Sequence, residues 1–458
     1  MSNSGKVQAQ QNLHRATISS LFGSIIEWYD FFLYGVVAGL VFDKLYFPGE
    51  NEFVSTMLAY GTFALGFVAR PLGGIIFGHF GDTVGRKKML MLTLLLMGGA
   101  TVAIGLIPTY DHIGIWAPIL LLFFRIVQGI GLGGEWGGAV LMTYESAPQA
   151  RRGFFSSIPQ TGMSLGLVLA SGVVGLLSWL LTDDAFLSWG WRVAFLLSGV
   201  MALVGGYIRN HVSESPEFEA MKKEADADKN QEKAPMPLVD TLRRYPRIIL
   251  ACMGARMIDG VFFNVFGVYS LNYLTRELEL PRTVALVGVM ISALLMTCFI
   301  PFWGAVSDRV GKARVYGLGA LFASLSAFPA FYVMQTFSGN IYLVWLAIII
   351  PFGIFHAAVF GTMSSFFSSC FDAKVRYTAI SFVYQLAGVV AGGLTPIIAT
   401  VLTDINGGDP WLLCLYVLAA GLLSVACTRW IARHVPDQAT HSNKESVPTA
   451  FQTSSTTS

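Results

Sequence analysis

Three polar side chains lie within the first long apolar segment of the chain, at a spacing that places them on one helix face. Glu27, Asp30 and Tyr34 are separated by three and four residues, which is the spacing of neighbours on a helix surface. Two carboxylates one turn apart in a medium of low dielectric constant resist simultaneous ionisation. The pair is therefore suited to reversible proton binding, with a structural ion pair to Arg125 or Arg70 as the alternative.

Arg125 begins a glycine-rich stretch inside another apolar segment, RIVQGIGLGGEWGG (residues 125–138). A phosphate-binding glycine loop follows a strand, whereas apolar helical sequence flanks this stretch on both sides. Gly129, Gly133 and Gly137 repeat every four residues, which predicts a groove for a neighbouring helix. Arg125 lies about 15 Å inside its segment at 1.5 Å per residue, where a lone charge costs at least about 2.5–3.5 kcal/mol. It therefore requires a partner or a polar cavity.

Other ionisable residues inside apolar segments have both a structural and a functional interpretation. Glu135 suits a salt bridge to Arg70, a contact with a neighbouring backbone, or a functional role. Arg256 and Asp259 are three residues apart and can pair within one helix, which alone would satisfy both. His356 lies near the middle of an apolar segment, where it either changes charge near neutral pH or only hydrogen-bonds a neighbouring helix.

Composition indicates that membrane-spanning helices position these residues. The chain has 458 residues, of which 54% are hydrophobic and 13% charged, against roughly 45–50% apolar residues in soluble domains. A span needs about 20 apolar residues. Twelve segments qualify, with centres near Trp28, Ala64, Leu96, Gln128, Leu167, Ser198, Phe262, Ala293, Ser324, Gly353, Val390 and Ala420. The net charge of +2 gives no reason to expect nucleic acid, and the five scattered cysteines indicate neither a disulfide framework nor a metal site; no cofactor is expected.

The spans form two groups of six around a hydrophilic stretch that contains MKKEADADKNQEK. We expect an N-terminal tail (1–16), a six-helix bundle (17–209), a partly helical linker (210–246), a second six-helix bundle (247–432) and a disordered tail (433–458). Lysine and arginine gather in alternate loops. Because short basic loops stay in the cytoplasm, the linker and both termini are predicted to be cytoplasmic.

A repeated motif indicates that the two groups are related. GHFGDTVGRKK, which begins at Gly78, recurs as GAVSDRVGKAR, so that Asp308 follows Asp82 by 226 residues. In the first copy, Gly78 permits close helix approach and Gly85 permits a tight turn. Asp82 is placed to cap a helix or to pair with a basic residue. An ordinary turn would explain one copy, but two copies at matching places indicate that the motif has the same role in both halves.

A second match has nearly the same offset. ARRGFFSSIPQTG aligns with KVRYTAISFVYQLAG, so that Arg376 follows Arg152 by 224 residues and Gln385 follows Gln160 by 225. Two independent matches at nearly the same offset predict duplicated halves. A duplicated helical bundle with a binding site between its halves is the architecture of secondary transporters.

The repeated glycine, aspartate and basic pattern resembles the signature of the major facilitator superfamily, between spans two and three and again between eight and nine. Further segments resemble its metabolite:proton symporters, the branch of shikimate, dicarboxylate, citrate and proline/betaine carriers: EWYDFFLYG, RPLGGIIFGHFGD, GGEWGGA, ESAP and SWGWRVAFL. The resemblance covers nearly all of the first half and, more loosely, the second. It implies an all-α membrane protein with twelve transmembrane helices in two pseudo-symmetric six-helix bundles.

The resemblance also implies a function. It predicts proton-coupled symport of a small organic acid by alternating access, by a multi-pass monomer in a bacterial inner membrane. A histidine at position 356, together with RMIDG on the seventh span, is more similar to the shikimate carriers than to the citrate or betaine carriers.

The resemblance assigns roles to individual residues. The family's loop aspartate latches the two halves at the cytoplasmic side through an arginine and a helix N-terminus of the opposite half, and Asp82 takes that role. The second copy has Lys312 and Ala313 in place of Arg86 and Lys87, so the latch is expected to be asymmetric. The gating or structural residues are Gly78, Asp82, Gly85, Arg86, Glu135, Arg152, Asp308 and Arg376.

The remaining assignments concern the proton and the substrate. The family motif on the fourth span associates Arg125 with proton coupling. The other proton-coupling candidates, proposed from the residues themselves, are Glu27, Asp30 and His356. The substrate-binding candidates are Tyr34, Arg125, Gln160, Arg256, Asp259, Asn264, Tyr384 and Gln385. If the substrate is an organic anion, Arg125 or Arg256 would bind its carboxylate, and Gln160 or Gln385 its hydroxyl groups.

Other functions remain open at this stage. A betaine or proline symporter, sodium symport and uncoupled facilitated diffusion all fit the same architecture. A membrane receptor or enzyme would need a soluble signalling or catalytic domain. The longest hydrophilic stretch is the central linker, which carries no GK[ST], HExxH or GxSxG pattern. We therefore expect that the protein is not an enzyme.

Overall fold

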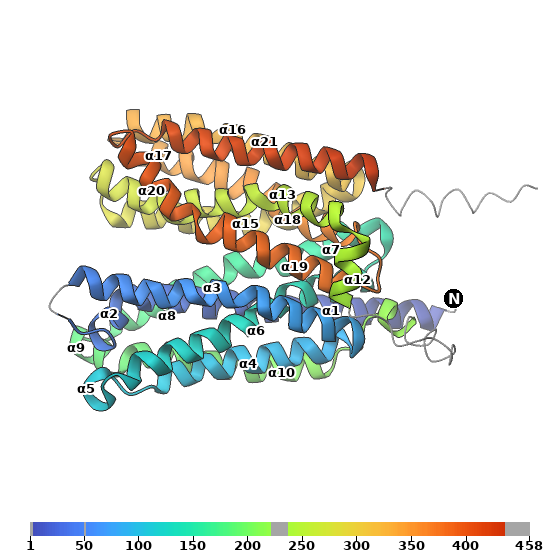
Figure 1. Cartoon of the computed structure of the whole chain (residues 1–458), viewed down its shortest axis with the longest axis horizontal. Helices are drawn as coiled ribbons and strands as arrows, with labels where there is room; N and C mark the ends of the chain where they lie inside the picture. The colour runs from blue at the N-terminus through green and yellow to red at the C-terminus, as the bar shows by residue number, and fades with distance from the viewer. Residues whose placement is uncertain (1–2, 50–51, 221–236, 436–458) are drawn as a thin grey trace, which may run out of the picture.

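The computed structural model describes residues 3–49, 52–220 and 237–435, and within these ranges every regular element is a helix. Twelve long helical segments form two bundles of six, stacked one above the other in Figure 1. Ten of them are long and apolar enough to cross a membrane, and α1 and α3 complete the set. The predicted all-α, twelve-helix fold is confirmed, and each predicted span centre lies inside one of these segments.

The spans of the first bundle are α1 (Asn3–Val37), α3 (Glu52–Thr83), α4 (Arg86–Leu106), α6 (Trp116–Ser146), α7 and α8 (Arg152–Ser157 and Gly162–Leu180, joined by η3, Pro159–Thr161) and α10 (Trp191–Asn210). Three spans of the second bundle are single helices: α15 (Arg282–Val310), α16 (Lys312–Thr336) and α21 (Trp411–His434). The span that begins with α13 (Pro246–Phe263) continues through η5 (Asn264–Tyr269), α14 (Ser270–Asn272) and η6 (Tyr273–Glu277). The other two are α17 (Ile341–Ile348) joined to α18 (His356–Ser368) by η7 (Ile349–Phe355), and α19 (Arg376–Gly388) joined to α20 (Thr395–Ile405) by η8 (Val389–Gly393).

Short helical segments lie between the spans. They are η1 (Ala38–Phe42), α2 (Asp43–Leu45), α5 (Tyr110–Ile113), η2 (Gln149–Arg151), α9 (Asp183–Ala185), η4 (Phe186–Gly190) and α12 (Pro237–Arg244). Helix α12 lies inside the predicted linker, 210–246, and α1 extends back through most of the predicted N-terminal tail, 1–16. Residues 221–236 of the linker and 436–458 of the predicted C-terminal tail lie outside the described residues.

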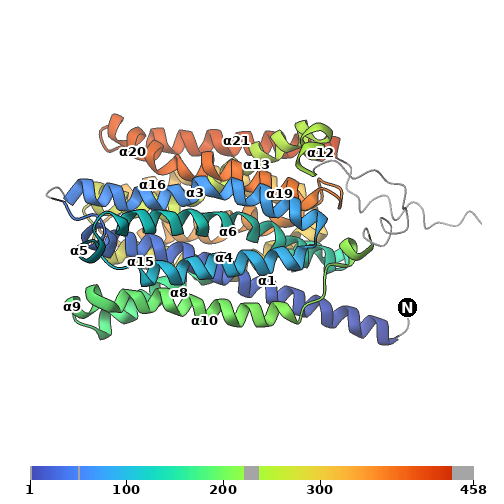
Figure 2. The ribbon, with the colours of Figure 1, turned by 60° about the horizontal axis from the view of Figure 1, so that its bottom comes forward.

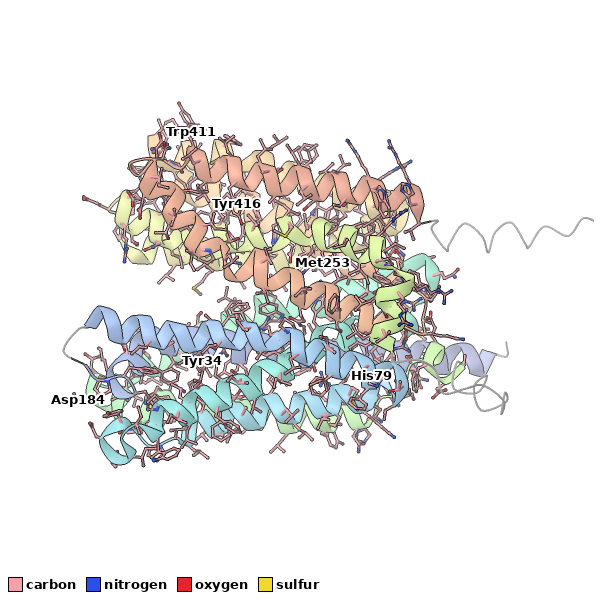
Figure 3. All side chains as sticks on the ribbon, in the orientation of Figure 1. Tyr34, His79, Asp184, Met253, Trp411 and Tyr416 are labelled. Atoms are coloured by element: carbon pink, nitrogen blue, oxygen red, sulfur yellow. The ribbon has the colours of Figure 1, made fainter. Side chains whose placement is uncertain are left out.

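The start of α1 and the end of α21 lie at the same end of the molecule (Figures 1 and 2). The repeated motifs, the α6–α7 loop and the α18–α19 loop are at this end, and their basic residues define what we call the basic end. Asp184 and Trp411 mark the opposite end (Figure 3).

The repeated motif forms the same turn in both halves. Gly85 precedes α4 with φ +132°, and Gly311 precedes α16 with φ +107°. Side chains other than glycine rarely adopt these angles. Glycine at both positions therefore allows each long helix to end and the next to begin within one or two residues.

The glycine stripe of α6 forms the predicted groove, and α3 fills it. A Cβ atom at Gly129 would collide with the carbonyl oxygen of Gly66, and one at Gly133 with that of Arg70. Gly78 makes a similar approach to the second bundle, because a Cβ atom there would lie 2.8 Å from Cα of Thr378. Small residues thus bring α3 against both α6 and α19, the close packing that membrane helices use in place of a hydrophobic driving force.

Candidate transport site

The first bundle encloses a chain of buried polar side chains that links Asp30 to Arg125. Thr101 of α4 donates its hydroxyl hydrogen to Oδ2 of Asp30 (2.8 Å) and accepts a hydrogen bond from Nε2 of Gln128 (2.7 Å). Gln128 accepts a hydrogen bond from Nη1 of Arg125, one turn earlier on α6. Asp30 and Arg125 are both 0% exposed. The Arg125 charge thus lies in a polar network inside the bundle, as its depth in the membrane requires.

Tyr34 belongs to the same network and is labelled within the first bundle in Figure 3. Its hydroxyl shares a hydrogen bond with Oγ1 of Thr62 on α3 (2.7 Å). The guanidinium carbon of Arg125 lies 4.1 Å from the centroid of the Tyr34 ring. A cation over an aromatic face is stabilised by the ring quadrupole, so Tyr34 helps to hold Arg125 in place.

Glu27 lies one turn closer to the basic end than Asp30, in a different environment. Its side chain is buried, and the charged groups that act on it are Glu135, Arg70 and Arg209. The two carboxylates of the predicted stripe therefore belong to separate polar groups, one around Arg125 and one around Arg70.

Glu135 forms a buried salt bridge, but its partner is not Arg70. The carboxylate pairs with Arg209 at the end of α10 and accepts a hydrogen bond from Oγ1 of Thr93 (2.8 Å). The expectation of an Arg70 partner was wrong for a geometric reason. Because the backbones of α3 and α6 are in contact, Arg70 turns toward α1, where its guanidinium lies 4.6 Å from the Phe31 ring centroid.

We expect Glu135→Gln to destabilise the protein by about 3–5 kcal/mol, because removal of one partner leaves a buried charge uncompensated. Denaturant or thermal unfolding of the purified full chain measures this loss. The double variant Glu135→Gln/Arg209→Gln should lose less than the sum of the two single variants. Unchanged stability combined with lost uptake would instead assign Glu135 a direct role in function.

The second bundle holds a buried triad of Arg256, Asp259 and His356. Nη2 of Arg256 lies 3.6 Å from Oδ2 of Asp259, and Nε2 of His356 lies 3.1 Å from Oδ1 of the same carboxylate. His356 stacks against neighbouring phenylalanine rings, including that of Phe262. The intrahelical pair exists as expected, but it does not satisfy Arg256. Among the described residues, Nε and Nη1 of Arg256 have no hydrogen-bond partner.

Tyr384 connects the two bundles through its ring. It stacks on Trp136 of α6, with centroids 3.8 Å apart and an interplanar angle of 11°. The guanidinium carbon of Arg256 lies 3.7 Å from the Tyr384 centroid. Since Trp136 covers one face of the ring, Arg256 covers the other. This stack joins α6 of the first bundle to α13 and α19 of the second.

The two glutamines of the repeat make matching contacts across the bundle interface. Nε2 of Gln160 donates to the carbonyl oxygen of Phe360 (3.1 Å), and Nε2 of Gln385 donates to that of Gly133 (3.0 Å). Gln160 also accepts a hydrogen bond from Nε1 of Trp136 (2.7 Å). In this conformation the two amide groups therefore bridge the bundles, and their predicted contact with substrate hydroxyls stays a prediction. Asn264, also predicted to bind substrate, donates to a carbonyl of its own helix.

The aspartates of the repeated motif cap helices of the opposite bundle at the basic end. The Asp82 carboxylate accepts hydrogen bonds from the backbone N–H groups of Tyr377 (3.3 Å) and Thr378 (2.9 Å) and from Oγ1 of Thr378 (2.9 Å). Asp308 accepts from the N–H groups of residues 153 (2.7 Å) and 154 (2.9 Å). Each carboxylate lies at the N-terminus of a helix, where the helix dipole stabilises negative charge. These contacts follow the pseudo-symmetry of the sequence repeat.

The basic partners of the two aspartates differ. Nη2 of Arg86 lies 3.8 Å from Oδ1 of Asp82, and its Nη1 lies 2.7 Å from Oε2 of Glu145. Arg376 of the second bundle contacts the other oxygen of Glu145 (3.0 Å). In the second copy, Lys312 lies over the Tyr144 ring instead. The aspartate contacts are thus symmetric, whereas in the described part of the chain the arginine contacts with Glu145 lie on the side of the first motif.

Glu217, in the segment after α10, joins this network from outside the spans. It pairs with Arg152 of the first bundle (2.6 Å) and with Arg376 of the second (2.5 Å). Partial burial alone would raise the pKa of Glu217, but Arg376 and Arg152 hold it below its ordinary value. Its ion pairs are therefore present above the usual pKa of a glutamate and are lost only as pH falls through the lowered value.

Several residues of these networks were not predicted from the sequence: Thr101, Gln128, Trp136, Glu145, Arg209 and Glu217. Thr101 and Gln128 are uncharged, so nothing in composition distinguishes them from other polar residues in a span. Arg209 reads as an ordinary basic residue at a helix end. Glu145 begins the ESAP segment, and its position in a motif was the one available signal. Among the described residues, no group of three or more His, Cys, Asp or Glu side chains could hold a metal ion.

Comparison with known proteins identifies the family. A family model described as Sugar (and other) transporter matches residues 16–428. The chain is 41% identical over 412 residues to the shikimate transporter of Escherichia coli (strain K12), an alignment that covers 90% of this chain and 92% of that protein. It is 33% identical over 398 residues to the proline/betaine transporter of the same strain, covering 86% and 78% of the two chains.

Solved structures agree on the fold. The major facilitator superfamily proton:xylose symporter XylE bound to 6-bromo-6-deoxy-D-glucose superposes with a TM-score of 0.75 at 16% identity, over 93% of this chain and 97% of that chain. The family and the fold are those of transporters and not of enzymes. The chain therefore belongs to the sugar (and other) transporter family, within the major facilitator superfamily of multi-pass membrane transporters.

Proposed function

We propose that this transporter carries a small organic acid inward together with a proton, by alternating access between its two bundles. The observation that carries the proposal is the Asp30 carboxylate, which is 0% exposed and linked to the Arg125 guanidinium through Thr101 and Gln128. A carboxylate at this depth costs free energy, so one is usually found there only where it has a partner or a functional role. Here the polar chain provides a path by which protonation of Asp30 changes the interactions of Arg125.

Coupling requires that the proton and the substrate favour the same conformational switch. If protonation of Asp30 or Glu27 and substrate binding each stabilise the same transition, neither ligand alone dissipates the gradient. The contacts of Asp82 and Asp308 close the basic end in this conformation, so the switch must break them. His356, bonded to Asp259, is a further candidate for proton coupling in the second bundle.

Basic loops support a cytoplasmic orientation of the basic end and of both termini, in a bacterial inner membrane. An inner membrane metabolite transport protein of Escherichia coli (strain K12), YhjE, is 38% identical over 390 residues, which supports this location. We propose that a single chain is sufficient for transport, because both halves of the site come from the same chain. The shikimate transporter relative supports a hydroxylated carboxylic acid as substrate. The proline/betaine relative supports a zwitterionic carboxylate as the second candidate.

Uptake of labelled shikimate into proteoliposomes that contain the purified full chain tests the proposal. With an acidic exterior, we expect accumulation above equilibrium and its collapse on addition of a protonophore. A sodium gradient without a pH difference should drive nothing. Competition by aromatic, keto and dicarboxylic acids and by glycine betaine ranks the substrate classes. Uptake that ignores the protonophore would contradict proton coupling, and preferential competition by betaine would favour the second candidate.

A further inference from the structure

We propose that Arg70 of the first bundle and Arg256 of the second bind the substrate carboxylate together. Arg70 had only a structural interpretation from the sequence, as a partner of a buried carboxylate. The inference rests on the proposed function, because it names the group of the organic acid that is recognised and the two side chains that recognise it.

Both guanidinium groups are deeply buried and incompletely hydrogen-bonded. Arg70 and Arg256 are each 5% exposed. Among the described residues, Nε and Nη2 of Arg70 and Nε and Nη1 of Arg256 have no hydrogen-bond partner. A buried donor without a partner costs about 1–3 kcal/mol, and more when it is charged. Four such donor atoms on two cations indicate a position adapted to an anion.

The two arginines lie near the same helix contact. Helix α3 packs against α19, where a Cβ atom at Gly74 would lie 3.1 Å from Cγ of Gln385. Arg70 is one turn before Gly74 on α3, and Tyr384 precedes Gln385 on α19. Arg256 lies on the Tyr384 ring, and Arg70 is within electrostatic range of both Tyr384 and Arg256.

Aromatic rings lie beside both guanidinium groups, and Asp259 contacts Nη2 of Arg256 without engaging its Nε or Nη1. Arg70 lies 4.6 Å and 4.9 Å from the ring centroids of Phe31 and Phe67. Arg256 lies 3.7 Å from the centroid of Tyr384. The N–H groups of a guanidinium point outward in its plane, in the fork geometry that matches a carboxylate. The N–H groups of Arg70 and Arg256 that lack a partner are therefore of the kind that binds a planar anion.

Arg125 is less suited to this role, although the sequence made it a candidate. Its guanidinium donates to Gln128, lies over Tyr34 and belongs to the Asp30 network of the first bundle alone. Arg70 and Arg256, by contrast, come from different bundles. A carboxylate between them draws the two halves together, so substrate binding itself would favour the occluded conformation.

Binding of labelled shikimate to the detergent-purified full chain tests the pair. We expect Arg70→Gln and Arg256→Gln each to raise Kd by about 30-fold or more, the effect of removing one partner of a buried charged contact. The control is Arg276→Gln, an exposed arginine near the opposite end, which should bind as the wild type. Labelled glycine betaine is the second probe if shikimate does not bind, because it also carries a carboxylate.

A measurement on the wild type keeps the test independent of variant folding. Shikimamide, in which a neutral carboxamide replaces the carboxylate, should fail to displace labelled shikimate at a 30-fold higher concentration than shikimate needs. If the glutamine variants do not fold, Arg70→Lys and Arg256→Lys replace them and should weaken binding, because lysine lacks the planar fork. Wild-type affinity in both glutamine or both lysine variants, or equal displacement by the amide, would overturn the pair.

The two proposals fail in different ways. Shikimate binding that depends on both arginines, together with uptake that ignores a protonophore, would overturn proton coupling and support the pair. Proton-driven uptake with unchanged affinity in both arginine variants would support proton coupling and overturn the arginine pair. Absence of binding by either carboxylate to the folded wild type would overturn both.

Discussion

Asp30→Asn is expected to abolish proton-driven accumulation while leaving exchange of substrate across the membrane. Asparagine has nearly the shape of aspartate, and its amide oxygen can still accept the hydrogen bond from Thr101. It cannot take up a proton, so the step that couples the pH gradient to Arg125 is lost. One pH unit corresponds to about 1.36 kcal/mol, or about tenfold accumulation for one proton per substrate. We expect this accumulation to fall to the level of equilibration.

Two assays in proteoliposomes separate coupling from transport. Uptake driven by an acidic exterior measures accumulation, and counterflow of labelled against unlabelled shikimate measures exchange without net proton movement. Wild type should perform both, whereas Asp30→Asn should perform only counterflow. Arg276→Gln is again the control for a change of charge outside the site. Loss of counterflow as well would make Asp30 a structural or binding residue, and unchanged accumulation would remove it from the mechanism.

Glu27→Gln makes the comparison sharper, because Glu27 and Asp30 belong to different polar groups. Glu27 is influenced by Arg70 and Arg209, whereas Asp30 bonds to Thr101 in the Arg125 network. If both variants lose accumulation, protonation of both groups is required. If only one does, that carboxylate carries the proton and the other compensates the charge of its neighbouring arginine.

The fold was predictable because its determinants are local or periodic. Each span is an apolar segment of the required length, and the glycines of the repeated motif set the same turn at positions 85 and 311. The recurrence of the Asp82 motif around Asp308 indicates that the two halves are duplicated. The spans and turns depend on residues near one another in the sequence, and the duplication depends on a repeated motif, so all of them can be recognised before any packing is known.

The partners of the buried charges could not be predicted, because they depend on which helices touch. Glu135 and Arg209 are 74 residues apart and meet only because α4 packs against both α6 and α10. Arg70 was one expected partner of Glu135, but its guanidinium lies beside the Phe31 ring of α1, and the carboxylate that acts on it is Glu27. Sequence periodicity predicts which residues share one face of a helix. Whether two charged residues pair depends also on how their two helices are oriented about their axes.

Asp82→Asn and Asp308→Asn are expected to weaken closure of the basic end, with the larger effect at position 82. Asp82 accepts three hydrogen bonds at the start of α19, and Asp308 accepts two at the start of α7. A hydrogen bond to a charged group contributes about 1.5–3 kcal/mol, and charge at a helix N-terminus adds about 0.3–1 kcal/mol. Loss of the charge should therefore favour opening by about tenfold or more.

Hydrogen–deuterium exchange measures this opening directly, because the groups that the aspartates cap are backbone N–H groups, which exchange when the contact opens. We expect faster exchange in peptides that contain Tyr377 and Thr378 in Asp82→Asn, and in peptides that contain residues 153 and 154 in Asp308→Asn. Asp404→Asn, an exposed aspartate near the opposite end, is the control. Unchanged exchange at both helix starts would show that the aspartates do not hold the bundles together.

The single variants distinguish two local caps from one shared latch, and the double variant tests whether their effects add. If each aspartate only caps its own helix, each single variant should accelerate exchange at one helix start and leave the other unchanged. If both hold a single two-state closure, either variant should accelerate exchange at both starts, because opening breaks both contacts at once. The free-energy effects should then add in the double variant, since the two aspartates share no partner. The ion pairs of Arg376 with Glu145 and Glu217 span the same interface, so they limit how far closure is lost and keep both variants measurable.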